Sequence, residues 1–203
     1  MTHHLHHGDL PESVEFGSVV AVDTEAMGLN PHRDRLCLVQ LSSGDGNAHL
    51  VQIMPGEYEA ARLKALMADP TVTKLFHFAR FDLAMIYHYL GVMAGPVYCT
   101  KIASRLARTF TDKHGLRDLC KDVLNVDISK QQQSSDWGAA TLTDQQLQYA
   151  ATDVLHLHAL RARLDAMLTR EGRADLAQAA FDFLPARVLL DLEGWAEQDI
   201  FAH

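Results

Sequence analysis

The sequence predicts an α/β protein in which a mixed β-sheet is flanked by helices. Runs of apolar and β-branched residues, separated by turn residues, occupy the first quarter of the chain, and helical periodicity dominates afterwards. This order is typical of a sheet that helices cover. The composition agrees with an ordered fold, because 48% of the 203 residues are hydrophobic and 22% are charged.

The strand-forming segments come first. Three runs are expected to form strands, at residues 18–25, 35–42 and 49–53. Gly28 and Pro31 follow the first run, and the turn-forming segment 43–47 follows the second. Because these connections are short, we expect the three strands to pair as an antiparallel meander.

Five helices are expected from their periodicity and end signals. They cover residues 57–68, 79–90, 100–108, 116–124 and 143–168, with a short strand at 74–78 between the first two. Gly91 ends the second helix, and Thr143 with Gln146 forms a capping-box pattern at the start of the last.

We expect one domain over residues 1–203, with a core at about 18–170 and a helical tail at 171–203. The polar loop 129–136 is too short to separate two domains. No role is assigned to the histidine-rich start, residues 3–7, which we interpret as a frayed terminus, a weak metal-binding tract or an expression remnant.

Several classes of protein are excluded. The cysteines are isolated and odd in number, so neither a disulfide framework nor a thiolate zinc site is expected; they are Cys37, Cys99 and Cys120. With no apolar leader and no run of about 18 apolar residues, we expect a soluble cytoplasmic protein with no membrane association. A net charge of −8 argues against a general DNA-coating protein, but not against a nucleic-acid enzyme whose acidic residues bind metal.

Three groups of residues carry candidate chemistry. Asp23 and Glu25 stand two apart at the end of a strand, so both project from one face and a cation would relieve their repulsion. Asp82 lies in a helix that is apolar on almost every side, and a buried carboxylate needs a partner. Tyr149 and Asp153 share one helix face. Each group alone also fits a structural role, such as a solvated strand end or a charge near a helix N-terminus.

Taken together, the order and spacing of these groups resemble the three motifs of the DEDD superfamily of 3′-to-5′ exonucleases, in its tyrosine-bearing branch. More closely, the chain resembles a short bacterial ribonuclease D without the C-terminal helical domains of longer members. The resemblance covers roughly residues 18–170. The matching segments are Val22–Glu25, Lys74–Asp82, Lys130–Trp137 and Gln148–Asp153.

The resemblance implies a ribonuclease H-like exonuclease fold and a metal-dependent phosphodiester hydrolase. Asp23, Glu25, Asp82 and Asp153 would hold two divalent cations, Mg²⁺ or Mn²⁺, and Tyr149 would orient the attacking water. The expected function is a 3′-5′ exoribonuclease that converts single-stranded RNA 3′ ends to nucleoside 5′-monophosphates in RNA maturation or turnover. One alternative is a DNA-directed 3′-5′ exonuclease, because nothing in the motifs reads a 2′-hydroxyl. The other is a catalytically inert RNA-binding relative that keeps the fold but not the chemistry.

Substrate contacts are also implied by the resemblance. Met27 and Leu29 follow the acidic pair, where related enzymes place a wedge against the terminal bases, and His77 would approach the terminal nucleotide. The alternative for Leu29 is a turn or core residue, and the alternative for His77 is a packed core histidine. Lys130 and Trp137 match the loop that precedes the third motif.

A cationic helix face supplies a further expectation. Lys101, Arg105 and Arg108 fall on one face, and residues 101–121 hold six Lys or Arg against two Asp. We expect this face to follow the RNA backbone, with an ordinary solvated face as the alternative. The apolar residues of the tail are expected to dock on the core or to form a homodimer interface.

Overall fold

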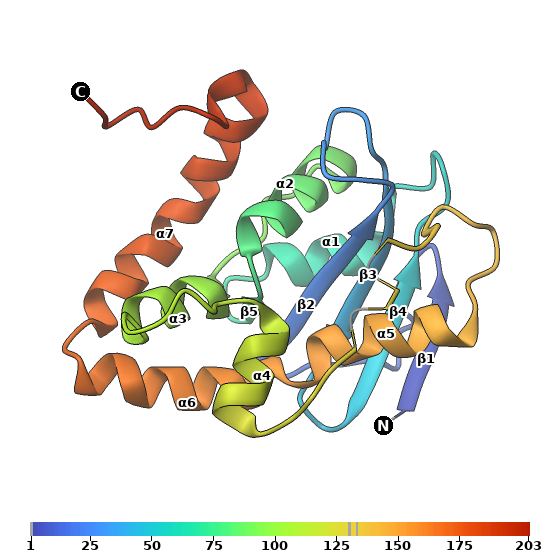
Figure 1. Cartoon of the computed structure of the whole chain (residues 1–203). Coiled ribbons are helices and arrows are strands. Elements are labelled where there is room, and N and C mark those ends of the chain that lie inside the picture. Colours follow the sequence, from blue (N-terminus) through green and yellow to red (C-terminus); the bar gives the residue numbers. More distant parts are fainter. Residues whose placement is uncertain (1, 130, 133) are drawn as a thin grey trace.

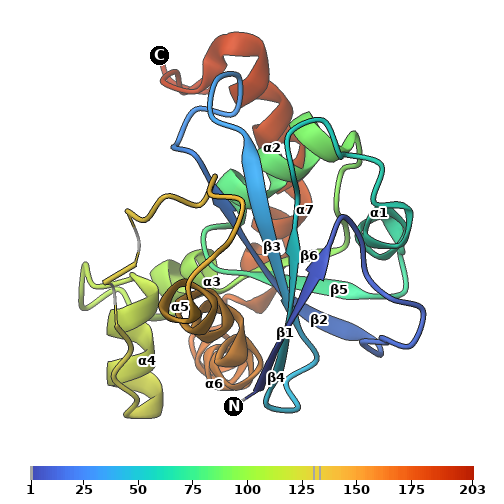
Figure 2. The same cartoon turned by 90° about the vertical axis from the view of Figure 1, so that its right-hand side faces the viewer.

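The structure, a computed structural model, describes residues 2–129, 131–132 and 134–203. A mixed six-stranded sheet in the order β1-β4-β3-β2-β5-β6 forms its centre, and helices flank it (Figures 1 and 2). The strands are β1 (Thr2–His7), β2 (Val19–Ala26), β3 (Leu36–Ser42), β4 (Asn47–Gln52), β5 (Thr73–Phe76) and β6 (Val97–Cys99). The helices are α1 (Ala61–Ala68), α2 (Ala79–Leu90), α3 (Thr100–Ala107), α4 (Leu116–Leu124), α5 (Asp144–Leu155), α6 (Leu157–Arg170) and α7 (Ala174–Leu190), followed by the turn η1 (Asp191–Trp195).

The pairing of the strands confirms the predicted meander. β2 pairs antiparallel with β3, and β3 pairs antiparallel with β4, whereas β1, β5 and β6 join by parallel pairing. The register of β2 on β3 shifts between Glu25 and Ala26. Such an irregularity bends a strand and redirects its side chains, and here it lies where β2 leaves the sheet.

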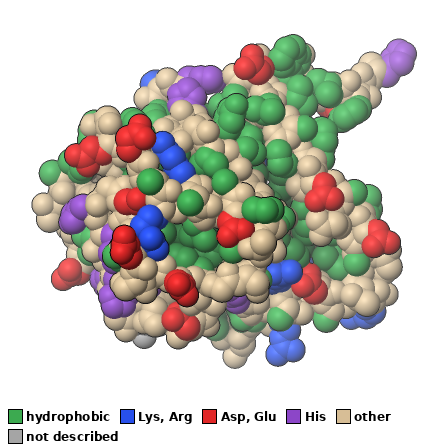
Figure 3. Space-filling view, turned by 180° about the vertical axis from the view of Figure 1, so that it is seen from behind, with side chains coloured by type: hydrophobic (Ala, Val, Ile, Leu, Met, Phe, Trp, Pro, Cys, Tyr) green, Lys and Arg blue, Asp and Glu red, His purple; other side chains and the backbone are tan. Residues whose placement is uncertain are grey.

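The histidine-rich start is an ordered strand, which corrects the expectation of a frayed terminus. β1 aligns His4 with His49 of β4, and their rings stack at 5.1 Å between centroids. Without β1 the outer edge of β4 would leave backbone groups unpaired, and β1 satisfies them. Histidine side chains gather at the left edge of the molecule seen from behind, on the side where β1 lies (Figure 3).

The single long helix expected at 143–168 is two helices. α5 and α6 meet at His156, whose φ and ψ are −103° and −9°. The apolar stripe continues through both, because Val154 and Leu157 are both fully buried, so periodicity alone did not indicate the break. The capping box of Thr143 and Gln146 is confirmed. Elsewhere α1 begins at Ala61 and not at residue 57, and the short strand β6 was not expected.

Helices on both faces of the sheet enclose the core. α5 packs across β1, β2, β3 and β4, and α1 lies on the opposite side of the sheet (Figure 2). α2 packs against β2, β3, β5 and β6, and α7 contacts α2, α3, α6 and β6 (Figure 1). The three cysteines are free and buried. In the described part of the chain, no helix combines the length and apolar character that crossing a bilayer requires.

Candidate active site

Three carboxylates meet where β2 and α5 pack together. Asp23 and Glu25 project from one face of β2, and Asp153 faces them from α5, which packs across that strand. One ligand oxygen from each of the three lies within 4.8 Å of the others. Asp153 is 128 residues from Glu25 in the sequence, so these acids meet only because the strand and the helix are in contact.

Asp82 is anchored beside this cluster and is not one of its three members. It lies in the first turn of α2, is 2% exposed, and accepts a 2.8 Å hydrogen bond from the hydroxyl of Thr24. Its charge still acts on the cluster, because it is one of the neighbours that raise the pKa of Glu25.

Burial raises the pKa values of all four acids, and neighbouring like charges raise those of Glu25, Asp82 and Asp153 further. Burial raises the pKa of Asp23 to about 7. Burial, with the charges of Asp23, Asp153 and Asp82, raises the pKa of Glu25 to about 10. Burial and then the charge of Asp23 raise the pKa of both Asp82 and Asp153. A multivalent cation bound to these oxygens would remove the repulsion and favour the ionised forms.

Gln40 is a site residue that the motifs did not indicate. It lies fully buried on β3 directly opposite Asp23 in the antiparallel register, and its Nε2 donates to Asp23 Oδ2 at 3.3 Å. The available signal was a lone amide in the middle of an apolar strand, which needs a buried partner.

Tyr149 and Trp137 form the aromatic wall of the site. Their ring centroids are 6.1 Å apart. Burial, followed by the charge of Asp153, raises the pKa of Tyr149, so its hydroxyl stays protonated at neutral pH and serves as a hydrogen-bond donor. Trp137 is 2% exposed, and its Nε1 has no partner among the described residues.

The three clustered acids, Tyr149 and Trp137 line an open cavity of about 720 Å³. Met27 and Leu29, from the loop between β2 and β3, lie on its wall with 53% and 84% of their surfaces exposed. Such exposure rules out the core alternative for Leu29, although Leu29 still lies in a turn. His77 and Trp137 also line the cavity, whereas Lys130 lies outside the described residues.

His77 is held in one orientation by Thr100. The Thr100 hydroxyl donates to the Phe76 carbonyl at 3.1 Å, so its oxygen accepts from His77 Nδ1 at 2.9 Å. This network assigns the Nδ1-protonated tautomer to the neutral ring.

The cationic face predicted on α3 is only partly present. Lys101 lines the cavity, and its ammonium lies 4.2 Å from the centre of the Phe78 ring. Arg105 is exposed but does not line the cavity. Arg108 was wrongly assigned to this face: it is 3% exposed and donates to Asp122 at 2.6 Å. The reason is that α3 ends at Ala107 and the chain leaves the helical path at Arg108, whose φ and ψ are −116° and 59°.

Two further cavity residues were not predicted. Arg117, at the start of α4, supplies a second cation to the lining and pairs with Asp127 at 3.3 Å. Phe78, just before α2, has a φ of 71°, in a region that bulky residues rarely adopt, and remains 44% exposed on the cavity wall. Nothing in the sequence indicates such a backbone conformation.

The loop that carries Leu29 is held by its own polar contacts. Asp34 accepts from the backbone N–H of Asn30 at 3.0 Å and from the guanidinium of Arg33. A Cβ at Gly28 would lie 2.4 Å from Asp34 Oδ2, so only glycine leaves room for this carboxylate. The loop is therefore a defined structure beside the three acids.

Comparison with known proteins agrees with this arrangement. Residues 8–169 match the family described as 3′-5′ exonuclease. The chain belongs to this family of 3′-5′ exonucleases.

The relatives confirm the resemblance to ribonuclease D. The chain is 36% identical over 156 residues to ribonuclease D of Gluconacetobacter diazotrophicus and 32% identical over 157 residues to that of Escherichia coli. These matches cover 77% and 76% of this chain but 39% and 40% of the relatives. The chain thus spans about two fifths of the length of the curated relatives that it matches.

Solved structures confirm the predicted exonuclease fold. Brucella melitensis NrnC with bound Mg²⁺ is 54% identical, with a TM-score of 0.96 over 100% of both chains. The same protein bound to pGG is 55% identical, with a TM-score of 0.97 over 100% of this chain and 99% of that one. Escherichia coli ribonuclease D is 26% identical, with a TM-score of 0.75 over 84% of this chain and 45% of that one.

Proposed function

We propose that the chain is a metal-dependent 3′-5′ exoribonuclease that releases nucleoside 5′-monophosphates from single-stranded RNA. The observation that carries the proposal is the convergence of Asp23, Glu25 and Asp153 within 4.8 Å at a cavity that also holds two cationic side chains. Clustered carboxylates suit hard divalent cations, and the cations Lys101 and Arg117 suit a phosphate backbone.

Two divalent cations, Mg²⁺ or Mn²⁺, are the proposed cofactors. The donor set fits them, because all the clustered ligand atoms are carboxylate oxygens, and a relative of similar sequence is described with Mg²⁺. Asp23, Glu25 and Asp153 would hold the ions, with Asp82 contributing from α2. When bound, the ions supply an activated water and stabilisation of the leaving oxygen.

The remaining side chains bind and orient the substrate. Tyr149 donates its one hydroxyl proton to Asp153, so its oxygen accepts a hydrogen bond from the attacking water and sets the direction of that water. Met27 and Leu29 present exposed apolar surface to the terminal base, and His77 contacts the terminal nucleotide. Lys101 and Arg117 neutralise phosphates. Trp137 packs near Tyr149 and keeps its ring in place.

Short RNA is the proposed substrate class. The relative bound to pGG shares 55% of its residues with this chain over its whole length, which supports a short 5′-phosphorylated ligand. The setting that we propose is cytoplasmic RNA maturation or turnover, since both relatives named above are ribonucleases.

The test is digestion of synthetic pGG and of a 5′-labelled single-stranded RNA heptamer in Mn²⁺, with the corresponding DNAs in parallel. We expect stepwise release of 5′-monophosphates from RNA, no release in EDTA, and no activity in Asp23→Ala or Asp23→Asn. Asp175→Asn, which changes an exposed acid in the first turn of α7, is the control and should retain activity. Preference for the DNAs would establish the DNA-directed alternative, and RNA binding without metal-dependent cleavage would establish the inert relative.

A further inference from the structure

The turn η1 at the end of α7 contacts two of the elements that wall the candidate cavity. Its Leu192 carbonyl lies 3.1 Å from Nε2 of His32, in the loop that carries Leu29. Its Asp191 carboxylate binds the guanidinium of Arg80, in the first turn of α2, as an ion pair. The two walls belong to separate elements, so this turn connects them from outside the cavity.

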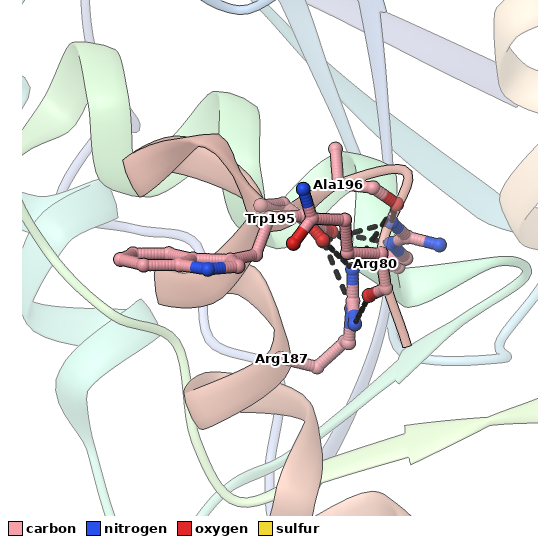
Figure 4. Close-up of polar contacts among 6 residues, drawn as sticks. Arg80, Arg187, Trp195 and Ala196 are labelled. Atoms are coloured by element: carbon pink, nitrogen blue, oxygen red, sulfur yellow. Dashed lines mark hydrogen bonds and ion pairs between the residues drawn. The ribbon is translucent and has the colours of Figure 1, made fainter. Parts of the chain in front are cut away.

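The contact with α2 is a charged network and not a single surface ion pair (Figure 4). Asp191 accepts from Arg80 Nη2 at 2.7 Å and from Arg187 Nη2 at 2.5 Å, and its side chain is only 12% exposed. Arg80 also donates to the Ala196 carbonyl at 2.9 Å, and Arg187 donates to the Trp195 carbonyl at 2.7 Å. Bidentate, partly buried pairs of this kind fix geometry more firmly than exposed ones.

A glycine makes this network possible. Gly194 has a φ of 104°, a conformation that residues with a side chain rarely adopt. It turns the chain after α7 so that the carbonyls of Trp195 and Ala196 point back at the two arginines (Figure 4). The local sequence is thus suited to closing η1 onto α2.

The braced elements carry cavity residues. Arg80 lies between Phe78 and Phe81, both of which line the cavity. His32 lies three residues after Leu29, and its ring also meets His88 of α2 edge to face at 5.1 Å. The loop that carries Leu29 and the helix next to the phenylalanines are thus linked directly through His32 and His88 and also through η1.

We propose that η1 is a brace, and that Arg80, Asp191 and His32 are positioning residues that fix the spacing of the two walls between which the RNA bases bind. The role in binding RNA rests on the proposed function, whereas the mechanical role of the brace does not. Three of the proposed ligands are held by β2 and α5, and Asp82 on α2 is fixed by its own hydrogen bond from Thr24. The brace therefore governs substrate affinity and leaves the chemical step unchanged.

The first test is backbone hydrogen–deuterium exchange on the full chain with Arg80→Gln and Asp191→Asn. A change in the exchange rate of the loop 27–35 can be measured because amides of this loop are hydrogen-bonded. For example, the Asp34 N–H donates to the Asn30 carbonyl at 2.7 Å. Both variants should raise the exchange rate of η1 and of this loop by about threefold or more, although neither substituted residue touches the loop. Arg170→Gln, which breaks an exposed pair with Glu171, is the matched control and should leave the loop unchanged. If exchange became faster in η1 but stayed at the wild-type rate in the loop 27–35, the proposed brace would be refuted.

The second test separates affinity from chemistry. In Arg80→Gln the KM for pGG should rise by about fivefold, which corresponds to about 1 kcal/mol. The kcat for pGG should stay within about twofold of the wild type. The kcat/KM for bis(p-nitrophenyl) phosphate, a phosphodiester without nucleobases, should also stay within about twofold. Equal losses of kcat/KM on pGG and on bis(p-nitrophenyl) phosphate would overturn the positioning role. If the wild-type chain cleaves no RNA, the proposed function fails, and the exchange experiment still decides whether the brace exists.

Discussion

The hydroxyl of Thr24 donates a 2.8 Å hydrogen bond to Oδ1 of Asp82, and so joins the strand that carries two acids to the helix that carries another. Both residues are buried, with 5% and 2% of their surfaces exposed. Thr24 is the residue between Asp23 and Glu25, so strand alternation directs it away from them and toward α2. The middle residue of the motif thus orients a neighbouring acid.

Thr24→Val should impair both activity and stability. Valine keeps the shape but removes the donor, and the buried carboxylate then loses a partner at a cost of about 1–3 kcal/mol. Under the proposed function Asp82 helps to hold the metal, and loss of the partner that orients such a ligand lowers metal affinity or turnover by about 10- to 100-fold. Mn²⁺ titrations of RNA hydrolysis and urea denaturation measure the two effects. Thr24→Ser keeps the hydroxyl and should remain close to the wild type; a fully active Thr24→Val would contradict the prediction.

Glu25→Gln should stabilise the metal-free protein. Burial and three neighbouring acids raise the pKa of Glu25 from 4.5 to about 10. Between these values the folded state holds a proton that the unfolded state has released, so this residue makes stability fall as pH rises. In EDTA at pH 7.5 the variant should gain about 5 °C in Tm, which corresponds to about 2 kcal/mol in a chain of this size.

Calorimetry at pH 5 and pH 8 gives the matching control. The difference in Tm in favour of the variant should be larger at pH 8 than at pH 5, because Gln cannot ionise. Mn²⁺ should raise the Tm of the wild type more than that of the variant, since the ion binds the folded state. A variant less stable than the wild type in EDTA at pH 8 would refute the account of crowded charges.

Lys74 should make stability depend on pH in the direction opposite to Glu25. It is fully buried on β5, and its Nζ donates to the carbonyls of Asp69 at 2.6 Å and Gly95 at 2.5 Å. Burial lowers its pKa from 10.5 to about 8. Between these values the unfolded chain binds a proton that the folded one lacks, so the contribution of Lys74 to stability rises with pH.

Paired denaturation curves of the wild type and Lys74→Met from pH 7.5 to 10.5 test this dependence. The difference in unfolding free energy should move in favour of the wild type as pH increases, with a slope below the limit of about 1.4 kcal/mol per pH unit. Lys121→Met, at an exposed position, should show no such slope. A flat difference for Lys74→Met would mean that the amine keeps its ordinary pKa.

Patterns with a fixed period were predictable from the sequence. The meander, the helix Ala79–Leu90 and the capping box at Thr143 follow from alternation, helical spacing and end signals, and the structure confirms them. Three of the predicted acids converge for the same reason, because strand alternation and packing of an apolar helix stripe leave few other arrangements. Local rules thus place each of these residues on its own element, and the contact between β2 and α5 then brings the acids together.

Features that depend on tertiary contacts were missed. β1 exists because β4 has an open edge, and nothing in a run of histidines indicates this. The break at His156 lies within a continuous apolar stripe. Gln40 and Arg117 come from elements distant in sequence, and Arg108 is buried although its helical spacing places it with Lys101.

The corrected cation set leads to a graded prediction for RNA binding. Lys101→Glu and Arg117→Glu change side chains that line the cavity. Each should weaken binding and reduce the salt slope by about one unit, because each removes one phosphate contact. Arg105→Glu, outside the cavity lining, should have the smaller effect and is the matched control. Arg108→Glu should instead lower stability by about 3 kcal/mol, since it leaves a buried charge opposite Asp122.

Fluorescence anisotropy of a labelled RNA heptamer at several salt concentrations measures the salt slopes of binding. Ca²⁺ replaces Mg²⁺ in these titrations to limit cleavage. Thermal denaturation measures the stability of Arg108→Glu. Salt slopes that fall for Arg105→Glu but not for Arg117→Glu would place the backbone along the outer face of α3, as the helix pattern alone suggested. A salt slope that falls for Arg117→Glu but not for Arg105→Glu would support a path through the cavity, where Lys101 and Arg117 face the same space as the clustered acids. In that case the phosphates adjoin the carboxylates, and binding should require the divalent ion, because the ion offsets the repulsion between the two sets of negative charges.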